Sequence, residues 1–259
     1  MATITIRKEV ARLSDPELEA IRDSYRKMMG ISDNRGWIYW NGIHGFPQYK
    51  CWHHGRVGFK ATASYNLFLP WHRAYLLNFE NAVRDQNDGA ALAWWDWTSS
   101  DSHTQGLPPQ FTQNLTGGNP LRSGPLPPMS GDPARQTERA FGSPNDLPTT
   151  AQLESLFNLT SFIDFQDQLE DIHDGIHGWV GGDMGVVAQA AFDPIFWAHH
   201  TMIDRIWYLW QLRHGITNVP PDYLDFPLEP FSLKVSDVLN ITNLGYTYSA
   251  AEVTVPVGV

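Results

Sequence analysis

The chain has 259 residues, a length that suits one large domain with a buried core, and we expect a single domain over residues 1–259. Eighteen Lys and Arg against 28 Asp and Glu give a net charge of -10, which argues against nucleic acid and anionic membrane surfaces as partners. The single cysteine, Cys51, excludes an intrachain disulfide and a cysteine-rich zinc site. Any metal must therefore be held mainly by histidine.

The N-terminus has no basic segment followed by an apolar run, and no stretch of about 18 apolar residues occurs in the chain. We therefore expect no membrane span, and a cytoplasmic location by default unless a partner or a longer precursor directs export. Aromatic content of 13%, with 11 tryptophans, predicts a core built from large rings.

Two helices are predicted in the first third of the chain. Ser14-Asp15-Pro16-Glu17 has the pattern of a capping box, in which the Ser hydroxyl and the Glu carboxylate satisfy backbone groups at a helix start. A second helix is predicted from about Pro70 to about Gln86, because the fixed φ of proline suits a first turn. That start places His72 in the opening turn.

Two further helices follow in the second half. An apolar stripe predicts a helix that ends before Gly181-Gly182, with His173 and His177 four residues apart and pointing the same way: Phe162, Phe165, Leu169, Ile172 and Ile176. Asp193-Pro194 resembles an N-cap followed by a first-turn proline and predicts a helix that carries His200. Four helices thus carry or flank the histidines.

Two regions lack helical periodicity. The segment of about 102–148 contains half of the 18 prolines and predicts a long irregular loop, of the kind that often forms a lid or a site wall. After Pro220, short β-branched and aromatic runs such as Tyr246-Thr247-Tyr248 predict a few short edge strands. The fold class is therefore expected to be mainly α, with long irregular loops and a few short edge strands.

Most of the 10 histidines fall into two clusters, which predicts a binuclear metal site. One cluster contains His44, His53, His54 and His72, and the other contains His173, His177, His199 and His200. A His-x-x-x-His pair on a helix, completed by a third histidine from a neighbouring helix, gives a three-coordinate site with an open position. Such a pair alone is more often a packing or surface feature, but the His199-His200 element on the next helix favours a metal site.

Several segments of the sequence resemble the motifs of a known family. The segments 68–76 and 193–205 resemble the two copper signatures of the tyrosinase, catechol oxidase and haemocyanin family. Similar family motifs are Trp94–Thr98, Trp179–Gly182, Tyr246–Tyr248 and Arg7, so the resemblance covers nearly the whole chain. It implies a four-helix bundle around a type-3 centre of two copper ions that binds dioxygen.

The resemblance also implies a ligand set. His44 and His72 would bind the first copper ion, and His173, His177 and His200 the second, with His199 as a neighbour. The sixth ligand departs from the family, because the middle histidine of the first site usually stands nine residues before the one in Trp-His-Arg, where this chain has Ala63.

Cys51-Trp52-His53-His54-Gly55 is similar to the Cys-x-His-Gly segment that often supplies the sixth ligand in the family. We favour His54, which precedes the glycine, over His53, which keeps the spacing from the cysteine. Cys51 is a candidate for a thioether to histidine, or else a buried or reactive thiol.

The resemblance implies a copper-dependent oxidoreductase that uses dioxygen to oxidise monophenols and/or o-diphenols to o-quinones, with a small phenolic substrate and a copper-delivery helper protein as expected partners. A catechol or o-aminophenol oxidase without hydroxylase activity is the alternative, followed by a haemocyanin-like oxygen-binding module. A zinc or iron hydrolase using the same histidines is the alternative outside the family. The absence of a C-terminal shielding domain in these 259 residues favours the enzyme over the carrier.

Two carboxylates are the candidate catalytic residues. Asp174 directly follows His173, where tyrosinases often have Asn, and either accepts the phenol proton or lies solvated on the helix surface. Asp164 is the candidate for the glutamate that accompanies that Asn in the family. Gly178, after His177, leaves room for a phenol ring or ends the helix.

Overall fold

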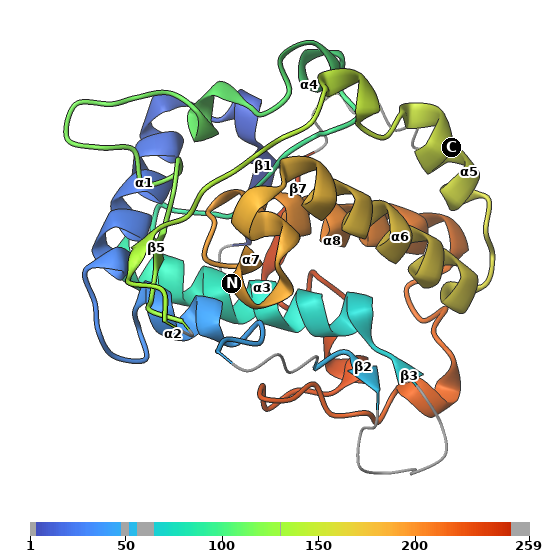
Figure 1. Ribbon diagram of the computed structural model, residues 1–259. Helices are drawn as coiled ribbons and strands as arrows, with labels where there is room; N and C mark the ends of the chain where they lie inside the picture. The colour runs from blue at the N-terminus through green and yellow to red at the C-terminus, as the bar shows by residue number, and fades with distance from the viewer. Residues whose placement is uncertain (1–3, 48–51, 56–64, 130, 250–259) are drawn as a thin grey trace.

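Helices dominate the computed structural model, which describes residues 4–47, 52–55, 65–129 and 131–249 (Figure 1). They are α1 (Asp15–Met29), α2 (Trp37–Gly42), α3 (Phe68–Gln86), α4 (Ser100–Gln105), α5 (Thr150–Phe157), α6 (Phe162–Val180), α7 (Val187–Ala190) and α8 (Ile195–His214). Helix α3 packs against α6 and α8, and α1 packs along α3. Among the described residues, no helix is both long and apolar enough to cross a membrane. The mainly α prediction is confirmed.

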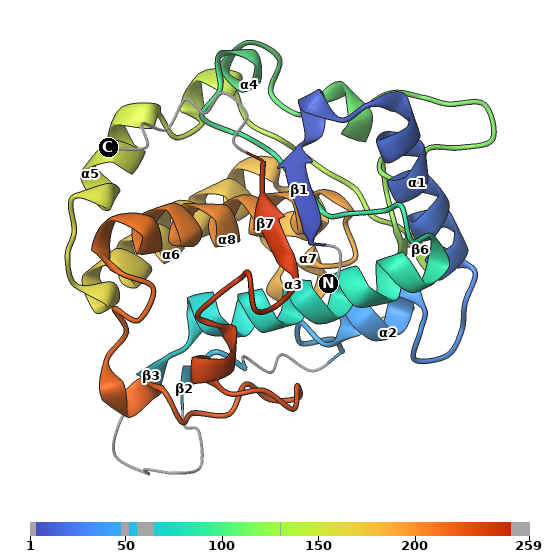
Figure 2. The same cartoon turned by 180° about the vertical axis from the view of Figure 1, so that it is seen from behind.

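The strands are short. β1 (Thr5–Glu9), β4 (Ala93–Trp94) and β7 (Tyr246–Tyr248) form a parallel sheet in the order β4-β1-β7. β2 (His54–Gly55) pairs with β3 (Tyr65–Asn66), and β5 (Pro125–Leu126) with β6 (Arg135–Gln136), both antiparallel. Figure 2 shows β1 and β7 side by side on the face opposite α6. The predicted strand at 246–248 is therefore an edge strand that joins the two ends of the chain.

The helix starts follow the capping chemistry of the sequence. The backbone N–H of Ser14 donates to the Glu17 carboxylate at 2.9 Å, which completes the predicted capping box of α1. The Asp193 carboxylate accepts from the N–H of Ile195, the first residue of α8, at 3.0 Å, but Pro194 and not the predicted Asp193 occupies the N-cap position. Helix α3 begins at Phe68, two residues earlier than Pro70, because the Asn66 side chain accepts the N–H of Phe68 at 2.9 Å.

The predicted irregular loop at about 102–148 is only partly irregular. The end of α4 and the β5–β6 pair lie inside it. Arg139 binds the Asp193 carboxylate at 2.5 Å, and Arg135 binds Asp183 at 2.6 Å. These ion pairs join residues that are far apart in the sequence, so local periodicity contains no sign of them.

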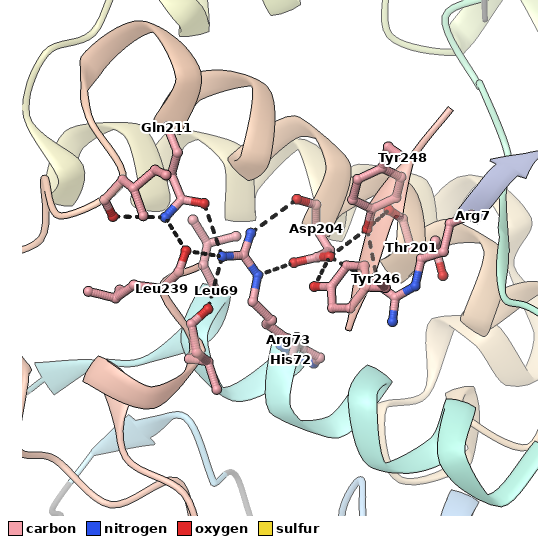
Figure 3. A network of polar contacts seen from close by, with 12 residues as sticks. Arg7, Leu69, His72, Arg73, Thr201, Asp204, Gln211, Leu239, Tyr246 and Tyr248 are labelled. Atoms are coloured by element: carbon pink, nitrogen blue, oxygen red, sulfur yellow. Dashed lines mark hydrogen bonds and ion pairs between the residues drawn. The ribbon is translucent and has the colours of Figure 1, made fainter. Parts of the chain in front are cut away.

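A buried carboxylate, Asp204 of α8, connects the helices to the sheet (Figure 3). It accepts from Arg73 of α3 at 2.5 Å, from Arg7 of β1 at 3.1 Å, and from the hydroxyls of Tyr246 and Tyr248 at 2.7 and 2.5 Å. Burial alone would raise the pKa of Asp204, but the two guanidinium groups hold it below the usual value. Arg73 is thus paired with a buried acid.

Replacing Asp204 with Asn should lower the free energy of unfolding by about 3–5 kcal/mol, because two buried arginines lose a shared counter-charge. Urea denaturation followed by tryptophan fluorescence measures the change. Asp33→Asn, which removes a solvent-exposed pair with Arg35, is the matched control and should leave the transition unchanged. Equal midpoints for the two variants would contradict the structural role of Asp204.

Candidate metal centre

Two groups of imidazoles meet where α3, α6 and α8 approach the segment after α2. In each group, one ligand atom of every member lies within 4.8 Å of the others: His44, His72 and His200 in one, and His173, His177, His199 and His200 in the other. The structure therefore brings together the five histidines that the resemblance assigns to copper outside the His53-His54 pair. His200 belongs to both groups, whereas His199 belongs to one.

Backbone carbonyls orient three of the rings through Nδ1. His44 Nδ1 lies 3.0 Å from the oxygen of Val187, His72 Nδ1 lies 2.9 Å from that of Phe68, and His177 Nδ1 lies 2.8 Å from that of Met184. A carbonyl oxygen can only accept, so each Nδ1 carries the proton and each Nε2 presents a lone pair. The Asp174 carboxylate, 3.0 Å from His173 Nδ1, has the same effect on that ring.

The Nε2 atoms point at one another at close range. Those of His173 and His177 are 2.9 Å apart, and His200 Nε2 lies 3.2 and 3.3 Å from the two. In the other group, the Nε2 atoms of His44 and His72 are 3.4 Å apart. Facing lone pairs repel unless a cation lies between them.

At neutral pH the cation between the Nε2 atoms is not a proton, because these imidazoles are unprotonated. Burial lowers the pKa of His44 and of His177 to about 4. The pKa values of His72, His173 and His200 lie well below the usual value. Burial is the largest cause, and the neighbouring imidazoles lower these pKa values further. The site is thus a set of neutral nitrogen donors, which suits a metal ion such as copper or zinc.

A tight glycine turn positions the second group. Helix α6 ends at Val180, and Gly181 and Gly182 follow with φ of 61° and 55°. A Cβ at Gly182 would lie 2.2 Å from the carbonyl oxygen of Glu138, so no other residue fits without rearrangement. The turn lets the Met184 carbonyl reach back to His177.

His53 is the sixth candidate that the structure places at the first group. Its ring centroid lies 5.0 Å from that of His72 and 5.9 Å from that of Trp71. The His53 carbonyl accepts the N–H of Leu67 at 2.9 Å, which fixes its backbone. Cys51, Ala63 and the side chain of His54 lie outside the described residues, so the preference for His54 stays a prediction.

Of the two predicted catalytic carboxylates, the structure brings only Asp174 to the histidines. Asp164 is exposed in the first turn of α6. At about 1.5 Å of rise per residue it lies roughly 13 Å along the helix from His173. This placement corrects the expectation that Asp164 belongs to the site.

Glu170 is a site residue that the sequence reasoning missed. It lies one turn before His173 and is buried, with a carboxylate oxygen 3.7 Å from His53 Nδ1. The Asn66 amide donates to it at 2.5 Å. The i, i+3 spacing to His173 was the available signal, because such residues share a helix face.

A solvent-open cavity of about 320 Å³ lies over the histidines. It is lined by His44, His53, Glu170, His173, Asp174, His177, Gly178, Met184, Gly185 and Val187. A Cβ built at Gly178 would meet nothing within 4 Å, so this side of the cavity is unobstructed. His199 is fully buried and its ring stacks on that of His173 at 5.1 Å, so it is a packing neighbour of the His173 ring.

Residues 34–213 match the family model described as the common central domain of tyrosinase. The chain belongs to this family. The predicted resemblance is confirmed, and the buried imidazoles are compatible with the type-3 copper site of the family.

Relatives within the family include both hemocyanins and tyrosinases. "Hemocyanin 1" of Megathura crenulata is 27% identical over 256 residues, which is 88% of this chain and 7% of that protein. "Tyrosinase" of Streptomyces glaucescens is 32% identical over 191 residues, covering 61% of this chain and 69% of that protein. A functional unit of Octopus hemocyanin has the same fold, with a TM-score of 0.80, 24% identity, and 98% of this chain and 70% of that one covered.

Without metal, the protein should lose stability as the pH falls from about 6.5 to about 4. The folded-state pKa values of His44 and His177, about 4, lie below the ordinary 6.5, so the unfolded chain binds more protons in this window. Urea unfolding of the metal-free protein at several pH values measures the effect. His44→Gln should flatten the pH dependence, and a wild-type protein equally stable across the window would contradict the burial of neutral rings.

Proposed function

We propose that this protein is a copper-dependent oxidoreductase that uses dioxygen to oxidise monophenols and/or o-diphenols to o-quinones. The observation that supports the proposal is the cavity of about 320 Å³ that opens to solvent beside His44, His173 and His177. Its size falls in the range of roughly 300–1,000 Å³ typical of small-molecule sites. Dioxygen alone needs no cavity of this size, whereas a phenol ring does.

We propose His44, His53 and His72 as ligands of one copper ion, and His173, His177 and His200 as ligands of the other. Bound copper would supply the redox chemistry and a positive charge that favours dioxygen and a phenolate. The chain itself supplies six imidazole rings, four of them with a fixed tautomer, and a cavity wall.

We propose that Asp174 accepts the phenol proton at the mouth of the cavity, as the substrate enters and before its oxygen reaches the histidines. Its side chain is 73% exposed, lines the cavity, and lies beside His173. Glu170, held by the Asn66 amide, would help to position His53. Gly178 leaves space for the ring above His177. The alternative role of Asp174 is to orient His173 only.

An oxygen-binding module is the second candidate function. It is supported by the haemocyanin relatives, which match most of this chain. The two candidates share the histidines and differ in whether a phenol reaches the metal. The cavity beside the histidines favours the enzyme.

His53→Ala should reduce the copper content from about two ions per chain to about one, because the first group keeps only His44 and His72 as its own ligands. Elemental analysis of purified protein gives the count. His103→Ala, at a histidine that instead contacts the carbonyl of Pro148, is the control and should keep the full content. Full copper in His53→Ala, with a loss in His54→Ala, would transfer the ligand role to His54.

Copper-loaded protein should consume oxygen with catechol, and tyrosine and 2-aminophenol assayed beside it define the substrate range. Asp174→Asn should slow tyrosine turnover by about 100-fold, within the usual range for a lost proton acceptor, and catechol turnover less. Oxygen uptake and quinone absorbance measure both rates. Reversible oxygen binding without turnover of any of the three substrates would establish the carrier function instead.

A further inference from the structure

The charged groups that the structure describes along the cavity are both acidic. Among the described lining residues, Glu170 and Asp174 are the charged side chains, and none is Lys or Arg. The two carboxylates lie four residues apart on α6 and so share one face of the helix. Bound copper would make the region of the histidines positive, so the negative potential belongs to the mouth, where the net charge of -10 of the whole chain adds to it.

The two carboxylates lie at different depths. The side chain of Asp174 is 73% exposed, so it lies at the mouth of the cavity. The side chain of Glu170 is 12% exposed and accepts from Asn66. Within the described part of the chain, Asp174 forms no ion pair with Lys or Arg, and its contact is the neutral ring of His173.

The position of a bound phenol follows from the cavity. In the proposed oxidase, its oxygen must approach the metal ions that the Nε2 atoms of the lining histidines would hold at the floor of the cavity. A substituent para to that oxygen then points away from the floor and toward the mouth. A charged group at its end therefore comes close to Asp174.

We propose that this site selects phenols and catechols whose side chain is cationic or neutral, such as aryl ethylamines, and discriminates against phenolic acids. The inference rests on the proposed oxidase function and specifies its substrate class. Specificity arises because the mouth attracts an ammonium group and repels a carboxylate, while the ring binds in the same way.

The expected size of the effect follows from Coulomb's law. Two unit charges about 6 Å apart in a water-like environment change binding roughly threefold, so attraction and repulsion together give a difference of about tenfold. Because the mouth is exposed, salt should screen most of this difference. The discrimination should appear in KM rather than in kcat, since the charged group is remote from the reacting oxygen.

Dopamine and dihydrocaffeate provide a matched test, because they share the catechol ring and the two-carbon spacer and differ in the terminal charge. Catechol is the neutral reference. Initial rates of oxygen uptake at low ionic strength should give a kcat/KM about tenfold higher for dopamine than for dihydrocaffeate. The ratio should fall toward unity in about 0.5 M NaCl.

Asp174→Asn should reduce the dopamine-to-dihydrocaffeate ratio severalfold, whatever it does to the absolute rates, because a loss of chemistry common to both substrates cancels in the ratio. Asp171→Asn is the matched control: it removes the same charge from the exposed surface of α6, outside the cavity lining, and should keep most of the ratio.

The outcomes separate this inference from the proposed function. Absence of turnover for catechol, dopamine and dihydrocaffeate alike would overturn the oxidase function. Turnover of all three with equal kcat/KM, or a ratio that Asp174→Asn leaves intact, would overturn the charge selectivity and leave the oxidase standing.

Discussion

Neutral imidazole nitrogens that face one another inside a buried site are the constraint on which this structure depends. Three rings are fixed through Nδ1 by backbone carbonyls, which leaves their Nε2 lone pairs pointing inward. Burial keeps these rings unprotonated, so a metal ion is the species that relieves the repulsion. The helices, and the glycine turn that returns the Met184 carbonyl to His177, hold the donors in this arrangement.

The same two groups of histidines would suit either oxygen binding or phenol oxidation. The histidines are compatible with the type-3 copper site of the family, and in the proposed function the access route to them determines what the metal acts on. In this chain the route is a cavity lined by two carboxylates and widened at Gly178. Its shape and charge are properties of loop and helix-surface residues, and surface loops in general vary more between homologues than the elements that they connect.

Much of the fold was predictable because its signals are local. The helix with His173 and His177 has a clear apolar stripe, and α6 covers 162–180 as expected. The site was predictable where a histidine lies on such a helix. His53 was harder to assign because it lies in a short non-helical segment, where the spacing of residues in the sequence does not fix the direction in which a side chain points. Asp164 was assigned wrongly because the family resemblance suggested an acidic residue on this helix but did not fix its position along it. The acidic residue near the histidines is Glu170, which lies one turn before His173.

Asp204 has a consequence for the spacing of the two metal positions. It lies one turn after His200 on α8, and its partner Arg73 directly follows His72 on α3. A short charged contact therefore joins the two helices right beside a histidine from each half of the centre. This ion pair fixes the position of α3 relative to α8, because the two helices cannot slide past each other without breaking it. The protein therefore sets the separation of the two histidine groups before any ion binds.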